Sequence, residues 1–207
     1  MKFILIAIIQ LTLLSGSNPI NFQYGILYKK DFNSNLEALE DSSIVYNNSQ
    51  LKINVVASKN TYLYLIYHGA DGSIMTLDMN QDKSNESNDF WSTSFLTLGP
   101  PTGIENLYLI NSSAPQSQLL KVIKGVSQST GAKQAKYKKM FFSLMNKMLN
   151  NATGRSSLQA SKLDTPIQGG VSFRGDDDEN QITIFSMTHE SPKMDDVSAV
   201  RISLVHQ

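Results

Sequence analysis

The fold is decided by the stretch Asn60–Met79, which has the sequence NTYLYLIYHGADGSIMTLDM. Its first part, Tyr62–His68, contains seven consecutive aromatic, aliphatic or imidazole residues, a composition typical of a strand with both faces covered. Gly69–Gly72 follows with two glycines and an Asp-Gly pair, which supply a turn. From Ser73 onward the side chains alternate between two faces, as in a second strand. The stretch therefore predicts a β-hairpin, and Gly72 is a structural residue of its turn.

The same period of two continues outside this hairpin. Leu51–Ala57 alternates cleanly, which places the apolar side chains Leu51, Ile53, Val55 and Ala57 on an inward face. Aromatic and β-branched composition predicts further strands over 22–30, 90–98, 106–110, 182–187 and 200–205. The polar segment 31–50 between the first two strands is expected to form a covering loop or one helical turn.

The hydrophobic period changes from two to 3.6 after Pro115. This change predicts two helices, over about 116–127 and about 132–150. The apolar positions of the first are Leu119, Leu120, Ile123 and Val126, and the amphipathic stripe of the second consists of Tyr137, Met140, Phe141, Leu144, Met148 and Leu149. The expected fold class is therefore mainly β: an antiparallel β-sandwich-like domain with one or two covering α-helices.

The N-terminus has the pattern of a secretory signal peptide. Lys2 precedes an apolar run of about a dozen residues, and small residues follow at Ser15–Ser17. An uncleaved membrane anchor is the alternative, but spanning a bilayer takes roughly 20 apolar residues and Gln10 interrupts this run. We predict a signal peptide over 1–17 and one β-rich domain over 18–207, with a core at 51–115, a helical part at 116–150, and a polar connection with C-terminal strands at 151–207.

The composition restricts the class of protein. A formal net charge of zero argues against a nucleic-acid binder, which usually carries a basic excess. The chain has no cysteine, so thiol catalysis, cysteine metal sites and an acylated N-terminal cysteine are excluded. We therefore expect an exported protein, periplasmic or extracellular, that is not a lipoprotein.

Four segments together resemble a known family of bacterial domains. The most specific is Gly99–Leu107, with the sequence GPPTGIENL, which is close to a Pro-Pro-Gly-x-Glu-x-Leu signature. The others are the strand at 51–56, Tyr-Leu-Tyr-Leu at 62–65 and Asp-Gly-Ser-Ile at 71–74. Residues from about 51 to 115 are in this way similar to domain-of-unknown-function family 4384. The chain departs from the family pattern by inserting Thr102 between the prolines and the glycine.

The resemblance implies an all-β, sandwich-like module of exported or multidomain bacterial proteins. Such modules are accessory binding or interaction elements, and the family offers no catalytic residues to carry over. The resemblance makes Pro100, Pro101, Gly103 and Glu105 structural residues. The prolines would stiffen the approach to a strand, and Glu105 would bond exposed backbone amides or a neighbouring cation.

A basic window lies in the predicted helical part. Seven lysines fall between Lys121 and Lys147, and this window contains no Asp or Glu. Such asymmetry in a neutral chain steers it toward anionic surfaces, such as phospholipid headgroups or wall polymers. The alternative is that the lysines only keep the outer helix face in water. The candidate binding residues of this window are Lys133, Lys136 and Lys139.

Aromatic side chains form a second group of candidates. Tyr64, Tyr67 and Trp91 would line a binding groove on the sheet, as tyrosine and tryptophan do at many interfaces. Alternatively, they fill the core of the sandwich.

The sequence contains no recognisable catalytic or metal motif. The acidic run at 176–179 lacks the spacing of a calcium loop, and His68, His189 and His206 lack zinc-ligand spacing. There is also no Gly-x-Ser-x-Gly elbow. We therefore predict no catalytic residue, no metal and no cofactor.

The function expected from these patterns is non-enzymatic. It is an envelope-associated binding or assembly module that recognises a protein partner or an anionic polymer, with peripheral membrane contact compatible with the pattern. One alternative is a hydrolase whose triad is assembled from distant residues. Another is a structural subunit of an extracellular assembly, joined through exposed edge strands.

Overall fold

The structure is a computed structural model of the whole chain. It describes residues 20, 22–32, 34–58, 60–77, 80–82, 88–151, 157–161, 184–188 and 197–207. The predicted signal peptide at 1–17, the acidic run at 176–179 and His189 lie outside the described residues.

The predicted hairpin is present as β5 (Tyr62–His68) and β6 (Ile74–Leu77). The two strands pair antiparallel, with His68 opposite Ile74. The turn is closed by the Gly72 N–H, which donates to the Gly69 carbonyl at 2.9 Å. Gly72 has a φ of 76°, in the left-handed region that glycine adopts without steric cost. The Asp-Gly pair thus forms the turn that the sequence predicts.

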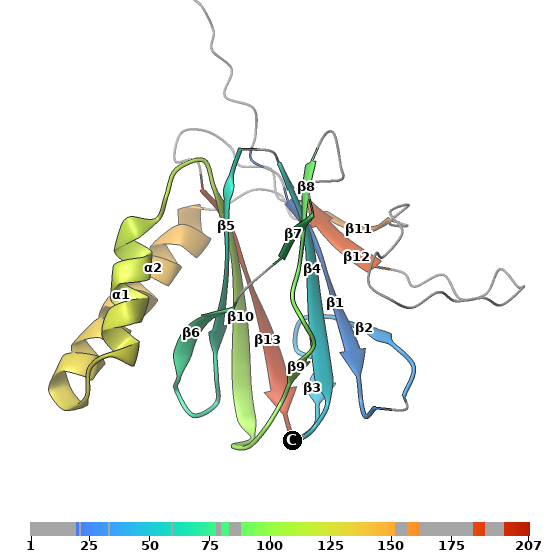
Figure 1. The fold of residues 1–207 in the computed structure, drawn as a ribbon, viewed down its shortest axis with the longest axis horizontal. Coiled ribbons are helices and arrows are strands. Elements are labelled where there is room, and N and C mark those ends of the chain that lie inside the picture. The colour runs from blue at the N-terminus through green and yellow to red at the C-terminus, as the bar shows by residue number, and fades with distance from the viewer. Residues whose placement is uncertain are drawn as a thin grey trace, which may run out of the picture.

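A five-stranded sheet containing this hairpin is the middle layer of the fold (Figure 1). Its order is β3-β13-β10-β5-β6, so β10 lies at the centre between β13 and β5. One pairing, β3 with β13, is parallel, so the sandwich is not wholly antiparallel as predicted. The bounds of the three strands not yet given are Ile44–Val45 for β3, Gly103–Ser112 for β10 and Val197–His206 for β13.

A six-stranded sheet faces the middle layer. Its order is β2-β1-β4-β8-β7, and β9 also pairs with β4. All these pairings are antiparallel. The bounds are Phe22–Lys29 for β1, Glu37–Leu39 for β2, Gln50–Ser58 for β4, Asn80–Asp82 for β7, Asn88–Ser92 for β8 and Leu96–Thr97 for β9.

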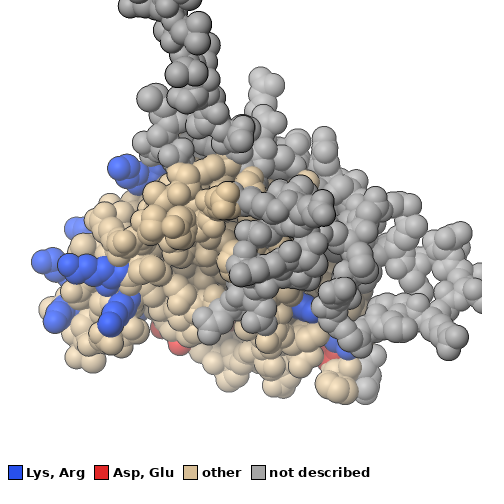
Figure 2. All heavy atoms as spheres, turned by 45° about the horizontal axis from the view of Figure 1, so that its top comes forward, with Lys and Arg blue, Asp and Glu red and all other residues tan. Residues whose placement is uncertain are grey.

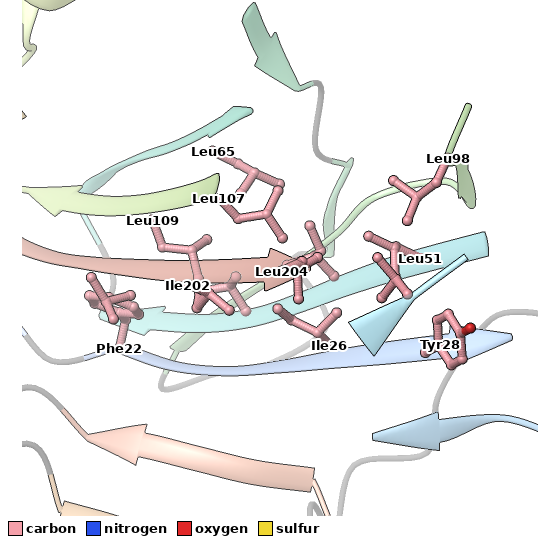
Figure 3. Close-up of a cluster of buried hydrophobic side chains, with 14 of the residues drawn as sticks. Phe22, Ile26, Tyr28, Leu51, Leu65, Leu98, Leu107, Leu109, Ile202 and Leu204 are labelled. Carbon is pink, nitrogen blue, oxygen red and sulfur yellow. The ribbon is translucent and has the colours of Figure 1, made fainter. Parts of the chain in front are cut away.

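Apolar side chains from both sheets form the sandwich core (Figure 3). Leu51, Ile53, Val55 and Ala57 of β4 are each at most 1% exposed, as the alternation predicts. Leu107 and Leu109 of β10 and Ile202 and Leu204 of β13 meet them from the middle sheet.

Two helices cover the other face of the middle sheet (Figure 1). They are α1 (Ser117–Ser127) and α2 (Gly131–Asn151), close to the predicted bounds. Ile66, Tyr108 and Ile110 point from the sheet into this second core. The apolar run of β5 is therefore buried on both faces, and the fold is mainly β with a sandwich and two covering helices.

Four short strands occupy positions where no strand was predicted. β2 and β3 lie in 31–50, where a covering loop or helical turn was expected, and each is held by a longer neighbour. β7 follows the predicted hairpin, and β11 (Ser157–Ser161) lies in the predicted polar connection and pairs with β12 (Ile184–Thr188). Strands this short carry little periodic signal, so tertiary pairing decides them.

Candidate functional site

The helical layer is positioned by one apolar stripe on each helix. In α1, Leu119, Val122, Ile123 and Val126 are buried against the sheet, at the spacing of three and four that one helix face requires. In α2, Phe141 and Met145 are 0% and 2% exposed. The Phe141 ring meets Tyr108 edge-to-face, with centroids 5.7 Å apart. Leu120 and Met140, which the spacing assigns to the two apolar stripes, are exposed instead, so the prediction is wrong for these two residues.

The start of α1 is fixed by a side chain of β5. The Gln116 N–H, at the N-cap position, donates to the Tyr64 hydroxyl at 2.9 Å. The first N–H groups of a helix have no partner within it, so this bond satisfies one of them. Tyr64 thus anchors the helical layer to the sheet, a role that its sequence context does not reveal.

The two helices are in close contact at Gly125. A Cβ added at this position would lie 2.5 Å from ring atoms of Tyr137, which leaves room for a hydrogen only. The Gln134 side-chain amide also donates to the Val126 carbonyl at 3.1 Å, joining α2 to the end of α1. These contacts hold the helices as a packed pair and fix their outer surfaces side by side.

The outer surface of this pair carries the predicted lysines. We call it the lysine face; it consists of Lys121, Lys124, Lys133, Lys136, Lys139 and Lys147, all of them exposed. Neither helix contains an acidic residue, and no Asp or Glu occurs in the sequence between Glu105 and Asp164. Figure 2 shows the basic side chains gathered over the helical layer, at the left of the molecule. The structure therefore brings Lys133, Lys136 and Lys139 onto one surface of uniform sign.

The seventh lysine, Lys138, turns toward the hairpin instead. A Cβ added at Gly72 would lie 3.1 Å from its Nζ, so the ammonium sits over the β5–β6 turn. The positive charge of Lys138 lowers the pKa of both Asp71 and His68. The pKa of Asp71 is lowered, first by hydrogen bonds from Ser73 and also by Lys138. Lys138 is therefore partly neutralised, and we do not count it in the lysine face.

His68 lies at the junction between α2 and the end of β5. Its ring contacts Phe142 edge-on, with centroids 5.2 Å apart, and its Nδ1 is 3.4 Å from the Asn106 side-chain nitrogen. Burial lowers the pKa of His68, Lys138 lowers it further, and Asp71 opposes them. The imidazole is therefore held toward its neutral form.

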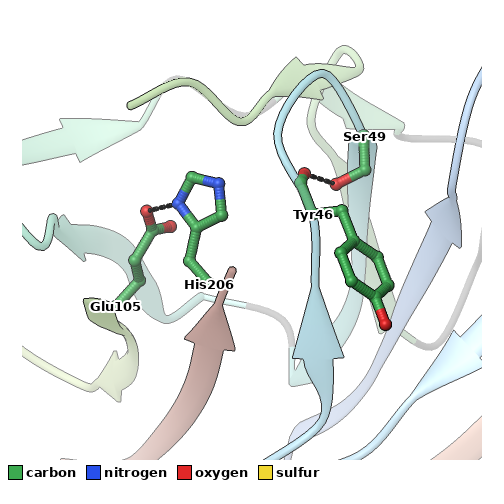
Figure 4. A network of polar contacts seen from close by, with 4 residues as sticks. All are labelled: Tyr46, Ser49, Glu105 and His206. Atoms are coloured by element: carbon green, nitrogen blue, oxygen red, sulfur yellow. Dashed lines mark hydrogen bonds and ion pairs between the residues drawn. The ribbon is translucent and has the colours of Figure 1, made fainter. Parts of the chain in front are cut away.

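A buried ionisable pair occupies one end of the sandwich (Figure 4). Glu105 Oε1 and His206 Nδ1 are 2.8 Å apart, and the two side chains are 1% and 0% exposed. Within the described part of the chain, Glu105 Oε2 and His206 Nε2 have no hydrogen-bond partner. Glu105 thus contacts an imidazole, whereas the resemblance implies exposed backbone amides or a neighbouring cation as its partner. The pair ties the start of β10 to the end of β13.

The predicted aromatic candidates do not converge on a groove. Tyr64 packs in the core under the helices, whereas Tyr67 and Trp91 pack against the sandwich core. Burial raises the pKa of Tyr67, and the nearby Glu105 carboxylate raises it further. Tyr64 and Tyr67 thus lie on opposite faces of β5, which disfavours a shared binding surface.

The proline-glycine segment leads directly into β10. Pro100 and Pro101 are exposed and joined by a cis peptide bond, and β10 begins at Gly103. Gly103 has a φ of 149°, and a Cβ there would lie 3.0 Å from the Cβ of Ala70. Only a residue without a side chain therefore fits against the hairpin turn.

Catalytic and metal constellations are absent from the residues that the structure describes. His68 and His206 face Asn106 and Glu105, not a serine hydroxyl. Over the same residues, no group of three or more His, Cys, Asp or Glu side chains is placed to hold a metal ion. Neither described helix combines the length and the apolar character that crossing a membrane requires.

Comparison with known proteins adds no relative. No family model matches the chain, and searches of curated proteins and of solved structures gave no significant match. The similarity to family 4384 stays a prediction, and the function is inferred from the geometry of the site.

Proposed function

We propose that this protein is an exported, non-enzymatic binding module that associates with an anionic component of the bacterial cell envelope through its lysine face. The observation that carries the proposal is the uniform charge of the helical layer. Six exposed lysines share one surface, and neither helix supplies an acid to neutralise them. Export is supported by the predicted signal peptide at 1–17.

The electrostatics of this surface suit a partner with many negative charges. Charges of one sign on neighbouring helices add their potentials and attract polyanions over about one Debye length, roughly 8–10 Å at physiological salt. The rest of the chain compensates the net charge to zero, so the attraction is local to the helical layer. Binding by this face is expected to be strong at low salt and weak at high salt.

The alternative functions have less support. The outermost strands β2, β3, β6 and β7 are only two to four residues long, so an assembly joined through strand edges rests on the outer edge of β13, where β3 pairs with Val205 and His206 only. A hydrolase needs a nucleophile within hydrogen-bond reach of a base. The two described histidines instead contact an amide and a carboxylate.

The test is binding to isolated bacterial envelopes. The triple variant Lys133→Gln/Lys136→Gln/Lys139→Gln is compared with the control Lys29→Gln/Lys30→Gln/Lys52→Gln, which removes the same charge outside the helical layer. Each lysine near an anionic surface contributes about 1 kcal/mol, so the first variant should bind roughly 100-fold more weakly. The control should retain binding at nearly the level of the unaltered chain.

Salt separates the proposal from recognition of a protein partner. Raising the salt from about 0.1 M to about 1 M shortens the Debye length from about 10 Å to about 3 Å and should release the chain. Retention at high salt on a stoichiometric protein would contradict the proposal, because it indicates a largely apolar interface. Equal loss of binding in both triple variants would also contradict it.

A further inference from the structure

We infer that the anionic component is the surface of a phospholipid bilayer, on which the helical layer lies flat with Leu120 and Met140 inserted among the headgroups. This inference rests on the proposed function and names the partner of the same lysine face. It depends on the apolar side chains that the face contains, in addition to its charge.

Two large apolar side chains are exposed on the outer surface of the helices. Leu120 is 42% exposed and Met140 is 36% exposed. The helices run antiparallel on either side of the turn at 128–130 (Figure 1), and the two residues are about equally far from that turn along their helices. They therefore lie at about the same level of the helical pair.

A lysine of the same face lies beside each of these apolar side chains. Lys124 lies four residues after Leu120, and Lys136 lies four residues before Met140. On a helix, residues four apart are neighbours on the surface, whereas adjacent residues such as Lys121 and Lys139 point about 100° away. The arrangement combines apolar contact with cationic anchors, which is how helices bind in the plane of a membrane interface.

The depth of insertion is limited by the fold. The apolar stripes of both helices, which include Ile123 and Phe141, are already buried against the middle sheet. Among the described large apolar side chains of the two helices, Leu120 and Met140 are the exposed ones, and with the aliphatic stems of the lysines they remain to contact lipid. The structure therefore fits shallow, reversible, peripheral binding, and not insertion of a helix.

The positively charged residues of the two helices are all lysines, which suits a fluid lipid surface better than one defined anion. Neither helix contains arginine, whose planar guanidinium grips one phosphate through two parallel hydrogen bonds. Lysine is a mobile point charge on a flexible stem, suited to many interchangeable headgroups. A hydrated anionic polymer satisfies the lysines equally well but gains little from Leu120 and Met140, so these two residues favour the bilayer.

The test is co-sedimentation of residues 18–207, which contain every described element, with phospholipid vesicles. We expect binding to vesicles of phosphatidylglycerol mixed with phosphatidylcholine, and none to phosphatidylcholine alone. The variant Lys133→Gln/Lys136→Gln/Lys139→Gln should partition roughly 100-fold more weakly into the anionic vesicles. Leu120→Gln/Met140→Gln should partition about tenfold more weakly, through loss of apolar contact. All these positions are exposed, and matching thermal unfolding curves would show that the fold is intact.

A matched control removes apolar exposure elsewhere. Met75→Gln/Ile104→Gln changes side chains that are 44% and 63% exposed on β6 and β10, away from the lysine face, and should leave vesicle binding unchanged. Equal partitioning of the Leu120→Gln/Met140→Gln variant and this control would overturn the insertion.

The lipid inference and the proposed function fail in different ways. If anionic vesicles bind nothing while envelopes stripped of lipid still bind the chain in a lysine-dependent manner, the partner is a polymer. The lipid inference is then wrong and the proposed function stands. If neither vesicles nor intact envelopes bind, both are wrong.

Discussion

The two faces of the middle sheet are both buried, but they are covered by different kinds of layer. Along β10, Leu107 and Leu109 enter the sandwich core, while Tyr108 and Ile110 enter the core beneath the helices. On the first side a second sheet provides the cover, and Glu105 is buried with His206 at its end. On the second side a pair of helices provides the cover.

The difference lies in what each cover leaves free. A helix buries only one stripe of its surface, so the remaining positions of α1 and α2 are open to selection for charge. The described side chains of the six-stranded sheet carry both signs of charge, with Lys29 on β1, Lys52 on β4 and Glu37 on β2. Both covers stabilise the middle sheet, and the helical layer alone carries the proposed binding surface.

The largest expected effect comes from truncating one buried side chain of similar size in each of the two cores. Leu109 and Ile110 are adjacent and both 0% exposed, and they point to opposite sides. Leu109→Ala and Ile110→Ala should each lower the free energy of unfolding by about 3–4 kcal/mol, through lost burial and a residual cavity. Urea unfolding is followed by the fluorescence of Trp91, the single tryptophan of the chain, and by the helical circular dichroism signal.

The two probes decide whether the layers unfold together. Trp91 packs against the sandwich core, whereas both helices lie on the other side of the middle sheet. We expect coincident transitions in both variants, because β5, β6, β10 and β13 each contribute side chains to both cores. If Ile110→Ala shifts only the helical signal, the helical layer is an independent unit and the expectation is wrong.

The buried pair at the end of the sandwich gives the next largest effect. Glu105→Leu leaves the His206 imidazole buried without its partner and should cost about 3 kcal/mol of unfolding free energy. Glu105→Leu/His206→Leu removes both polar groups and should recover most of that loss. Glu40→Leu, at an exposed position, is the control, and denaturant midpoints measure all three. A double variant no more stable than Glu105→Leu would show that the pair does not act as a unit.

The helical layer has its own weak point at Gly125. Gly125→Ala places a methyl group against the Tyr137 ring and should destabilise the protein by about 2 kcal/mol, despite the better helix propensity of alanine. Gly99→Ala, where nothing lies within 4 Å of the added Cβ, is the matched control. Thermal unfolding gives both values. A stabilised Gly125→Ala variant would mean that the helices separate easily, which would weaken the view of a fixed lysine face.

The smallest expected effect is the pH dependence that His68 contributes. Burial and Lys138 lower its pKa in the folded state, with Asp71 opposing and Phe142 and Asn106 uncharged beside it. The unfolded chain therefore binds a proton more readily, and stability falls as the pH drops through the ordinary histidine value of about 6.5.

Removing His68 tests that sign. In His68→Phe this loss disappears, so the stability advantage of the unaltered chain over the variant should shrink as the pH falls. Lys138→Gln should show a weaker pH dependence than the unaltered chain, because one cause of the lowered pKa is gone. Unfolding free energies measured across mildly acidic pH decide the question, and an advantage that grows on acidification would contradict the expected direction.

Much of the fold was predictable because burial leaves a period in the sequence. The apolar run of β5, the alternation of β4 and the helical spacing after Pro115 each place enough residues on a face to be recognised. The strands β2, β3 and β9 have two or three residues each, too few to show a period. Their existence depends on longer neighbours that only the folded chain brings alongside.

The candidate site divides in the same way. The lysine face could be predicted from composition and spacing. The apolar residues of each helix share one buried stripe, so the lysines between them point to the solvent. The Glu105–His206 pair could have been sought by continuing the inward positions of their strands, Leu107 to Glu105 and Leu204 to His206. That these two ends meet could not be seen, because the pairing of β10 with β13 joins residues about a hundred positions apart.

The position of β13 between β3 and β10 has a consequence for how the protein is made. Both neighbours are synthesised long before Val197–His206 emerges from the ribosome. Until then β10, at the centre of the middle sheet, has one edge unpaired. An open edge of this kind invites pairing with other chains. Because the middle sheet cannot close before these residues are made, the chain stays incompletely folded through most of its synthesis, and the proposed export through a translocation channel requires an unfolded chain.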